Sequence, residues 1–340
     1  MNPITQAKSE WFEVDHRVFN EEIIPRHKPA VLRGFVKHWP AVQHGLASAE
    51  AICAYLKSFD NGTQVNAIMT RPEEQGRVFY NEGMNGFNFL RNKLSISAII
   101  DQLSRYLDGK NPPCLAAQSA KIPECLPGFE KENQLPVLDP DIAPRIWIGN
   151  TITVPAHVDD ANNIACVISG KRRFTLFPPD QVENLYIGPL DYNPAGAPIS
   201  MVRAHDPDLK RFPNYPKALE KAQVFELLPG DALYIPPVWW HQVESIGKLN
   251  ILVNYWWGGS LGSTDKTNGP IECLMHCLLN MKDLPIETRA AWGSLFNHYI
   301  FHAQPNQFDY IPENRQGVLG KLSDDQIEAI KSGLIQKLRD

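Results

Sequence analysis

No stretch of the sequence is apolar for long enough to cross a membrane. A spanning helix needs about 20 consecutive apolar residues, and charged or polar residues interrupt every run well before that length. The first sixteen residues, MNPITQAKSEWFEVDH, also lack a basic segment followed by an apolar one. We therefore expect neither a secretory signal peptide nor a membrane segment.

Cysteine is sparse, and no two cysteines stand in a Cys-x-x-Cys pair. This pattern predicts reduced, mostly buried thiols and a cytoplasmic protein. The one cluster, Cys273-Leu-Met-His276-Cys277, has helical spacing inside an apolar stretch, which favours core packing over a metal site. The six cysteines are at positions 53, 114, 125, 166, 273 and 277.

The sequence also lacks an excess of positive charge. It has 33 Lys and Arg against 38 Asp and Glu, a net charge of −5, so we expect no nucleic-acid partner. Hydrophobic residues make up 43% and charged residues 21% of the 340 residues, which excludes wholesale disorder. No internal repeat or low-complexity tract is present.

Proline and glycine are abundant, with 28 and 22 residues, and they divide the chain into short segments. Turn residues between residues 145 and 257 separate short strands without long helices, a pattern typical of an antiparallel sandwich or barrel. The predicted strands are 146–154, 164–169, 172–177, 198–203, 223–228, 232–235, 241–246 and 249–257.

Helix-like segments flank this β-rich region on both sides. Before it we predict a short strand at 30–35, helices at 48–59 and 95–107, and Ser48 as an N-cap. After it we predict helices at 270–281, 285–301 and 323–338. The predicted divisions are 1–110, with helices and strands packing on a barrel, 111–260, the barrel itself, and 261–340, a helical segment and candidate dimerisation element.

The sharpest chemical feature is His157-Val-Asp159 at the end of a strand, with His241 at the start of a later one. Alternate residues of a strand share a face, so the first two side chains project together. Two imidazoles and one carboxylate form the facial triad of non-haem Fe(II) oxygenases. A single His-x-Asp pair also arises by chance, and a hydrogen-bonded surface pair is its simpler explanation.

Polar residues in otherwise apolar strands support a site. Alternation places Arg172 beside Phe174 and Leu176, where a cation needs an anion such as a ligand carboxylate. Asn254 lies in an apolar strand and needs partners from the backbone or from a ligand. The segment Pro229-Gly-Asp-Ala-Leu-Tyr-Ile-Pro-Pro-Val-Trp-Trp-His241 combines a tight turn with a short buried strand, and so presents its final histidine to a barrel mouth.

Three segments together resemble the JmjC or cupin-like Fe(II)/2-oxoglutarate oxygenases: residues 147–159, residues 170–179 and residues 229–241. The resembling branch is that of the asparaginyl hydroxylase called factor inhibiting hypoxia-inducible factor and its bacterial relatives. Residues 29–40, 77–81 and 86–89 are similar to that branch as well, and the resemblance covers about residues 10 to 260. It implies a mainly β fold, with a double-stranded β-helix (jelly-roll) core, flanking N-terminal α/β elements and a C-terminal helical segment.

The resemblance also implies ligands and site residues. His157, Asp159 and His241 correspond to the iron ligands, and Arg172 stands where a lysine usually binds the distal carboxylate of 2-oxoglutarate. The other predicted cosubstrate contacts are Asn163, Asn254 and Thr153. Val154 departs from the branch, which often has threonine there, and no counterpart of an upstream tyrosine is found near residues 113–115. Trp147, Trp239, Trp240 and Tyr80 are candidate substrate-pocket residues, although each also suits a core or lid.

The function implied is an oxygenase that uses Fe(II), 2-oxoglutarate and O2 to hydroxylate a C–H bond, with release of succinate and CO2. A protein or peptide side chain is the favoured substrate, and the resembling branch implies a homodimer. Three alternatives stay open: the same chemistry on a small molecule, a cupin-fold sensor that binds a metal or carboxylate without turnover, and a metal enzyme that does not use 2-oxoglutarate.

Overall fold

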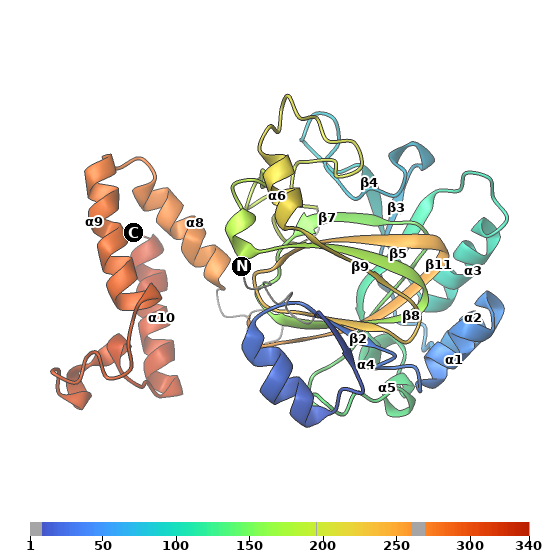
Figure 1. Ribbon diagram of the computed structural model, residues 1–340, viewed down its shortest axis with the longest axis horizontal. Coiled ribbons are helices and arrows are strands. Elements are labelled where there is room, and N and C mark those ends of the chain that lie inside the picture. Colours follow the sequence, from blue (N-terminus) through green and yellow to red (C-terminus); the bar gives the residue numbers. More distant parts are fainter. Residues whose placement is uncertain (1–8, 195, 260–268, 340) are drawn as a thin grey trace, which may run out of the picture. The chain divides into compact units, whose positions relative to one another are not determined.

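The computed structural model describes residues 9–194, 196–259 and 269–339. The chain forms two compact units, 1–273 and 274–340, and the division falls within the helix α8. Figure 1 shows the first unit as a layered β-structure with helices and the second as helices alone. No helix in the described ranges is both long enough and apolar enough to span a membrane.

Eleven strands of the described chain form one continuous sheet that folds over into two layers. The wide layer has the order β1-β2-β10-β8-β11-β6-β5-β3-β4, and the narrow layer has the order β7-β11-β8-β9. The strands are β1 (Glu10–Phe12), β2 (Ala30–Arg33), β3 (Val65–Thr70), β4 (Phe89–Leu94), β5 (Cys114–Lys121), β6 (Arg145–Gly149), β7 (Thr153–His157), β8 (Asn162–Phe177), β9 (Gln223–Leu227), β10 (Ala232–Ile235) and β11 (Trp240–Trp257).

The long strands β8 and β11 belong to both layers because they bend at the same level. Gly170 of β8 has a φ of +76°, and an added Cβ would lie 2.3 Å from Oδ1 of Asn250. That oxygen accepts the N–H of Lys171 at 3.2 Å, and the amide of Asn250 donates to the carbonyl of Gly247 at 3.1 Å. A buried asparagine and two glycines therefore fix the corner of the jelly roll.

Apolar residues fill the space between the layers, and helices cover the outside. The inner cluster combines narrow-layer residues such as Phe174 and Leu176 with wide-layer residues such as Val167 and Leu252. Helices α1 (Pro40–Ala47), α2 (Ala49–Phe59), α3 (Ile96–Tyr106), α4 (Ile122–Cys125) and α5 (Phe129–Glu132) contribute to the large cluster on the outer side of the wide layer, and α6 (Tyr215–Lys221) packs on the outer side of the narrow layer. This is the predicted double-stranded β-helix with flanking N-terminal elements.

Both predicted N-terminal helices are confirmed, and serines begin them. Oγ of Ser48 accepts the N–H of Ala51 at the start of α2, and Oγ of Ser95 accepts the N–H of Ala98 at the start of α3. The C-terminal helices are α8 (Pro270–Met281), α9 (Ile286–Phe296) and α10 (Asp324–Arg339), close to their predicted bounds.

Several strand predictions are wrong. The segment 146–154 is two strands, β6 and β7, while 164–169 with 172–177 and 241–246 with 249–257 are single bent strands. The segment 198–203 holds only isolated bridges at Ile199 and Ser200. Cys273 is exposed rather than packed in a core.

Candidate metal centre

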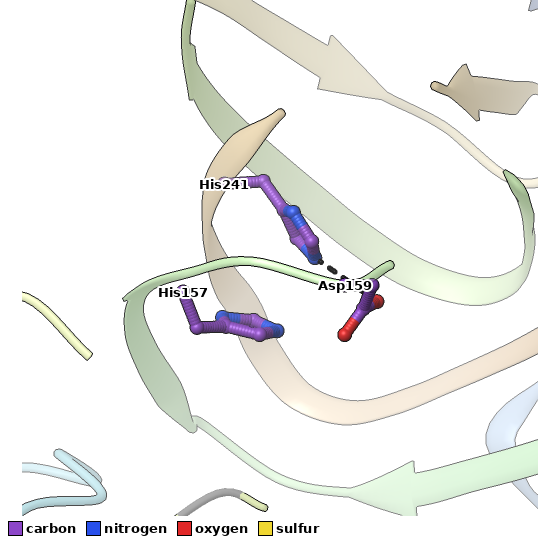
Figure 2. Close-up of side chains that lie close together, drawn as sticks. All are labelled: His157, Asp159 and His241. Atoms are coloured by element: carbon purple, nitrogen blue, oxygen red, sulfur yellow. Dashed lines mark ion pairs between the residues drawn. The ribbon is translucent and has the colours of Figure 1, made fainter. Parts of the chain in front are cut away.

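The two histidines of the predicted triad lie directly opposite each other on neighbouring strands. His157 ends β7 and pairs with His241 at the start of β11, so both side chains share one face. Asp159 follows two residues after the first histidine, beyond the end of the strand. Figure 2 shows the three side chains converging, and one ligand atom from each lies within 4.8 Å of the other two.

Backbone carbonyls fix the orientation of both imidazoles. Nδ1 of His157 lies 2.9 Å from the carbonyl of Pro155, and Nδ1 of His241 lies 2.9 Å from the carbonyl of Trp239. A neutral ring that donates from Nδ1 leaves its Nε2 lone pair free, as a metal ligand requires. Burial, with the neighbouring His157, lowers the pKa of His241 to about 4, so this ring is neutral at pH 7.

Asp159 completes the donor set. The residue is 9% exposed, and its Oδ2 lies 3.6 Å from Nε2 of His241. The same oxygen accepts a hydrogen bond from the indole N–H of Trp256 at 3.2 Å. Two nitrogens and one carboxylate on one side of a shared point suit a divalent metal that keeps other positions open. Within the described chain this is the one such group of three residues.

Arg172 is a buried cation that has no anion beside it among the described residues. It is 8% exposed and lies on β8 opposite Ser245, whose Oγ accepts a hydrogen bond from Nη1. Burial lowers its pKa to about 10. Its Nε has no hydrogen-bond partner, and no carboxylate of the described residues pairs with it. A charge placed in an apolar interior at this cost fits an anionic ligand group.

The two predicted asparagines contact each other on the inner face of the wide layer. Nδ2 of Asn254 lies 3.3 Å from Oδ1 of Asn163, and Oδ1 of Asn254 accepts the indole N–H of Trp147 at 2.8 Å. Their partners are therefore side chains rather than the backbone. The structure brings Asn163, Asn254 and Trp147 together as one polar chain.

A bulge separates Thr153 from the triad. His157 pairs with His241, but Val154 pairs with Val243 and Thr153 with Glu244. The extra residue in β7 reverses the alternation, so Thr153 shares the face of Glu244 while Val154 shares that of Val243. Thr153 and His157 therefore lie on opposite faces, although their even spacing in an unbroken strand predicts a shared face.

The candidate pocket aromatics lie in different places. Trp239 belongs to the inner cluster and donates its N–H to the carbonyl of His27 at 3.1 Å. Trp240 packs on the outer face of the narrow layer against Phe177, in the cluster that α6 covers, and its role in a substrate pocket stays a prediction. Tyr80 is 3% exposed and donates its hydroxyl to the carbonyl of Tyr192 at 2.6 Å.

Sequence reasoning missed three residues next to this site. Ser245 supports Arg172, Trp256 supports Asp159, and Arg145 lies over the indole of Trp256. Strand alternation was the available signal. Trp256 has the parity of Asn254, and Ser245 has the parity of His241.

Comparison with known proteins identifies the family. The sequence pattern of the cupin-like domain matches residues 16–262. The chain belongs to the cupin-like domain family. This cupin-like chain is 33% identical over 147 residues to HSPB1-associated protein 1 of Homo sapiens, covering 43% of the chain and 30% of that protein.

Two JmjC-named relatives are similar over a larger part of the cupin-like chain. Lysine-specific demethylase JMJ31 of Arabidopsis thaliana is 27% identical over 262 residues, 67% of the chain and 46% of that protein. Jumonji C domain-containing protein 5 of Drosophila melanogaster is 28% identical over 259 residues, 70% of the chain and 57% of that protein. The chain thus spans between 30% and 57% of these relatives' lengths. The narrower resemblance to the asparaginyl hydroxylase branch stays a prediction.

Proposed function

We propose that this cupin-like protein is an Fe(II)- and 2-oxoglutarate-dependent oxygenase that hydroxylates a side chain of a protein or peptide, as in the asparaginyl hydroxylase branch. The single observation that carries the proposal is the pairing of two features in one barrel interior. A His-Asp-His group suits a metal with open coordination positions, and the guanidinium of Arg172, whose Nε has no hydrogen-bond partner, suits a ligand carboxylate.

The residues fit these ligands in charge and in hydrogen-bonding capacity. His157, Asp159 and His241 would hold the iron, and Arg172 with Ser245 would hold the distal carboxylate of 2-oxoglutarate. When bound, the metal and cosubstrate supply the oxidising chemistry that inserts one oxygen atom into a C–H bond while succinate and CO2 are formed. No cation other than Arg172 is needed to balance the distal carboxylate.

The chain's own part is to position these groups and exclude water. The carbonyls of Pro155 and Trp239 orient both imidazoles through their Nδ1 atoms. The indole N–H of Trp256 holds the carboxylate of Asp159 in place. The apolar inner cluster around Arg172 removes competing water, which strengthens a guanidinium–carboxylate pair.

A protein substrate is supported by the names of the relatives. One of them is called a lysine-specific demethylase, a name that describes action on an amino-acid side chain. A cupin-fold sensor without turnover is less well supported, because the donor triad is complete and its imidazole nitrogens face one another. Action on a small molecule remains the second candidate within the same chemistry. The free state of all six cysteines suits the cytoplasm as the proposed compartment.

The test is an anaerobic titration of the Fe(II)-loaded protein with 2-oxoglutarate. We expect the weak visible charge-transfer band of a chelated cosubstrate, and succinate formation once O2 is admitted. Arg172→Ala should weaken cosubstrate binding about tenfold or more, because it removes the only cation assigned to the distal carboxylate.

Arg173→Ala is the matched control. Arg173 is the next residue of the same strand, but it pairs with Glu226 on the outer face at 2.7 Å. In the Arg173→Ala variant, the charge-transfer band should appear at the same 2-oxoglutarate concentration as in the wild type. The proposal fails if iron binds without any band, or if the two arginine variants bind 2-oxoglutarate equally well.

A further inference from the structure

A second arginine without an ion pair lies beside the metal centre. Arg145 begins β6 and pairs with Asn254 of β11, so its side chain is on the inner face with that asparagine. Its guanidinium carbon lies 5.5 Å from the centre of the Trp256 ring, and the indole N–H of Trp256 donates to Asp159. One aromatic side chain therefore separates Arg145 from a predicted metal ligand.

Contacts on one side hold the guanidinium of Arg145 in a fixed direction. Nη1 donates to the carbonyl of Ser119 at 3.1 Å and lies 3.2 Å from its Oγ. The ring of Trp256 supports its face. Among the described residues, its Nε–H and Nη2–H have no acceptor within hydrogen-bond distance, and no carboxylate forms an ion pair with it, although Glu124 interacts with its charge from farther away. These two N–H groups form the open edge of a half-buried cation.

The neighbouring basic residue differs in this respect. Lys121 pairs with Arg145 across β5 and β6, but it is exposed and forms an ion pair with Glu124 at 3.0 Å. Burial lowers the pKa of Arg145, but a guanidinium is still protonated at pH 7. Arg145 is thus a permanent, oriented positive charge whose open edge matches the two oxygens of a carboxylate.

We propose that Arg145 binds a side-chain carboxylate of the substrate, so that the substrate is an acidic peptide segment with Asp or Glu close to the residue that is hydroxylated. This inference rests on the proposed function, since it takes the metal centre as the place of reaction. The distal carboxylate of the cosubstrate is already assigned to Arg172 on β8, and its other carboxylate would bind the metal. A carboxylate at Arg145 is therefore assigned to the substrate.

The experiment selects peptides on the full-length protein loaded with Mn(II) and 2-oxoglutarate without O2. The probe is a library of random peptides, amidated at the C-terminus so that only side chains supply carboxylates. We expect enrichment of Asp or Glu at one position. The best peptide should bind about tenfold more tightly than its Asp→Asn or Glu→Gln analogue.

Variants then connect that preference to Arg145. Arg145→Gln should bind both peptides equally, and Arg145→Glu should favour an analogue with Lys at the same position. Lys121→Gln, the control on the adjacent strand, should keep the wild-type preference. The charge-reversed variant guards against a loss that comes only from misfolding, because its gain of a new preference needs a folded site.

The inference is overturned if the wild type retains no peptide or enriches no acidic residue, or if Arg145→Gln keeps the preference. The charge-transfer band of the wild type, and its succinate formation with ascorbate as the reductant in place of the substrate, need no peptide and test the oxygenase separately. If they appear without an acidic preference, only the role of Arg145 fails. If they are absent while the preference depends on Arg145, the acidic-peptide site stands and the oxygenase fails.

Discussion

Hydrogen bonds from neighbouring groups orient the three residues of the metal triad. Each imidazole is oriented by a carbonyl two residues before it in sequence, so the strand ends themselves fix the nitrogen that faces the site. Asp159 lies beyond the end of the strand, and among the described residues no backbone group orients its carboxylate in this way. The indole N–H of Trp256 supplies the missing restraint from the far end of β11.

Trp256→Phe should therefore weaken metal binding about tenfold while keeping an aromatic ring beneath Arg145. The measurement is the dissociation constant of Mn(II) for the metal-free protein, obtained by calorimetry. Activity is not needed for this readout. It separates the orientation of the carboxylate from any effect on turnover.

Trp257→Phe is the matched control for that substitution. Its ring stacks near Tyr234 and Phe19 on the other face of the strand, away from Asp159. Its metal affinity should equal that of the wild type. Equal affinity of the Trp256 variant and the wild type would show that the hydrogen bond does not position the ligand.

Strand alternation predicts much of the site, and its failures have a physical cause. It correctly places Arg172 on the inner face and Arg173 outside. It fails for Thr153 because a bulge adds one residue between that threonine and His157. No sequence pattern here marks the bulge. For Trp240 alternation holds: it is the neighbour of His241 in sequence, so its side chain lies on the opposite face of the strand.

At the scale of elements, the long bent strands bring the two halves of the site together. The first half of β11 carries His241 and Ser245 in the narrow layer, and its second half carries Asn254 and Trp256 in the wide layer. Sequence analysis divided both long strands at their glycines, because glycine is a common turn residue. The pairing of both bends through Asn250 is a tertiary contact that local sequence does not reveal.

Gly170→Ala should lower the free energy of unfolding by about 3 kcal/mol. A side chain at a φ of +76° is strained by about 1 to 2 kcal/mol, and its Cβ would also overlap Oδ1 of Asn250. Chemical denaturation measures this change. Because the corner sets the position of Arg172 in the narrow layer relative to Asn163 and Asn254 in the wide layer, 2-oxoglutarate binding should weaken in the same variant.

Gly247→Ala separates strain from overlap. Gly247 also has a positive φ, +112°, but an added Cβ would meet nothing within 4 Å. We expect a smaller loss, about 1 kcal/mol. An equal loss in both variants would mean that the contact with Asn250 adds nothing to the stability of the corner.

At the scale of the whole molecule, the C-terminal unit differs from the barrel in how its apolar side chains are covered. None of residues 274–338 is buried. Large apolar side chains are exposed on all three helices, among them Leu279, Trp292, Leu295 and Leu338. The sequence predicted the helices here from their apolar periodicity, but periodicity does not say what covers an apolar face. A segment of this size without a buried core needs a partner surface.

We predict that the partner surface is the same unit of a second copy, so that the protein is a homodimer. Trp292 and Leu295 are 45% and 44% exposed on α9, one helical turn apart. Replacing both with glutamate in the full-length chain places charges where two apolar faces would meet. Light scattering should show a dimer for the wild type and a monomer for this double variant.

Leu90→Glu is the control, because Leu90 is 68% exposed on β4 of the barrel unit. It adds the same charge to an exposed apolar position outside the C-terminal helices, and it should leave the dimer intact. A wild-type protein that is monomeric at every concentration would refute the prediction, since its apolar helices would then be covered within one chain. A double variant that stays dimeric would place the contact on another surface, because two buried carboxylates without partners cost more than such an interface gains.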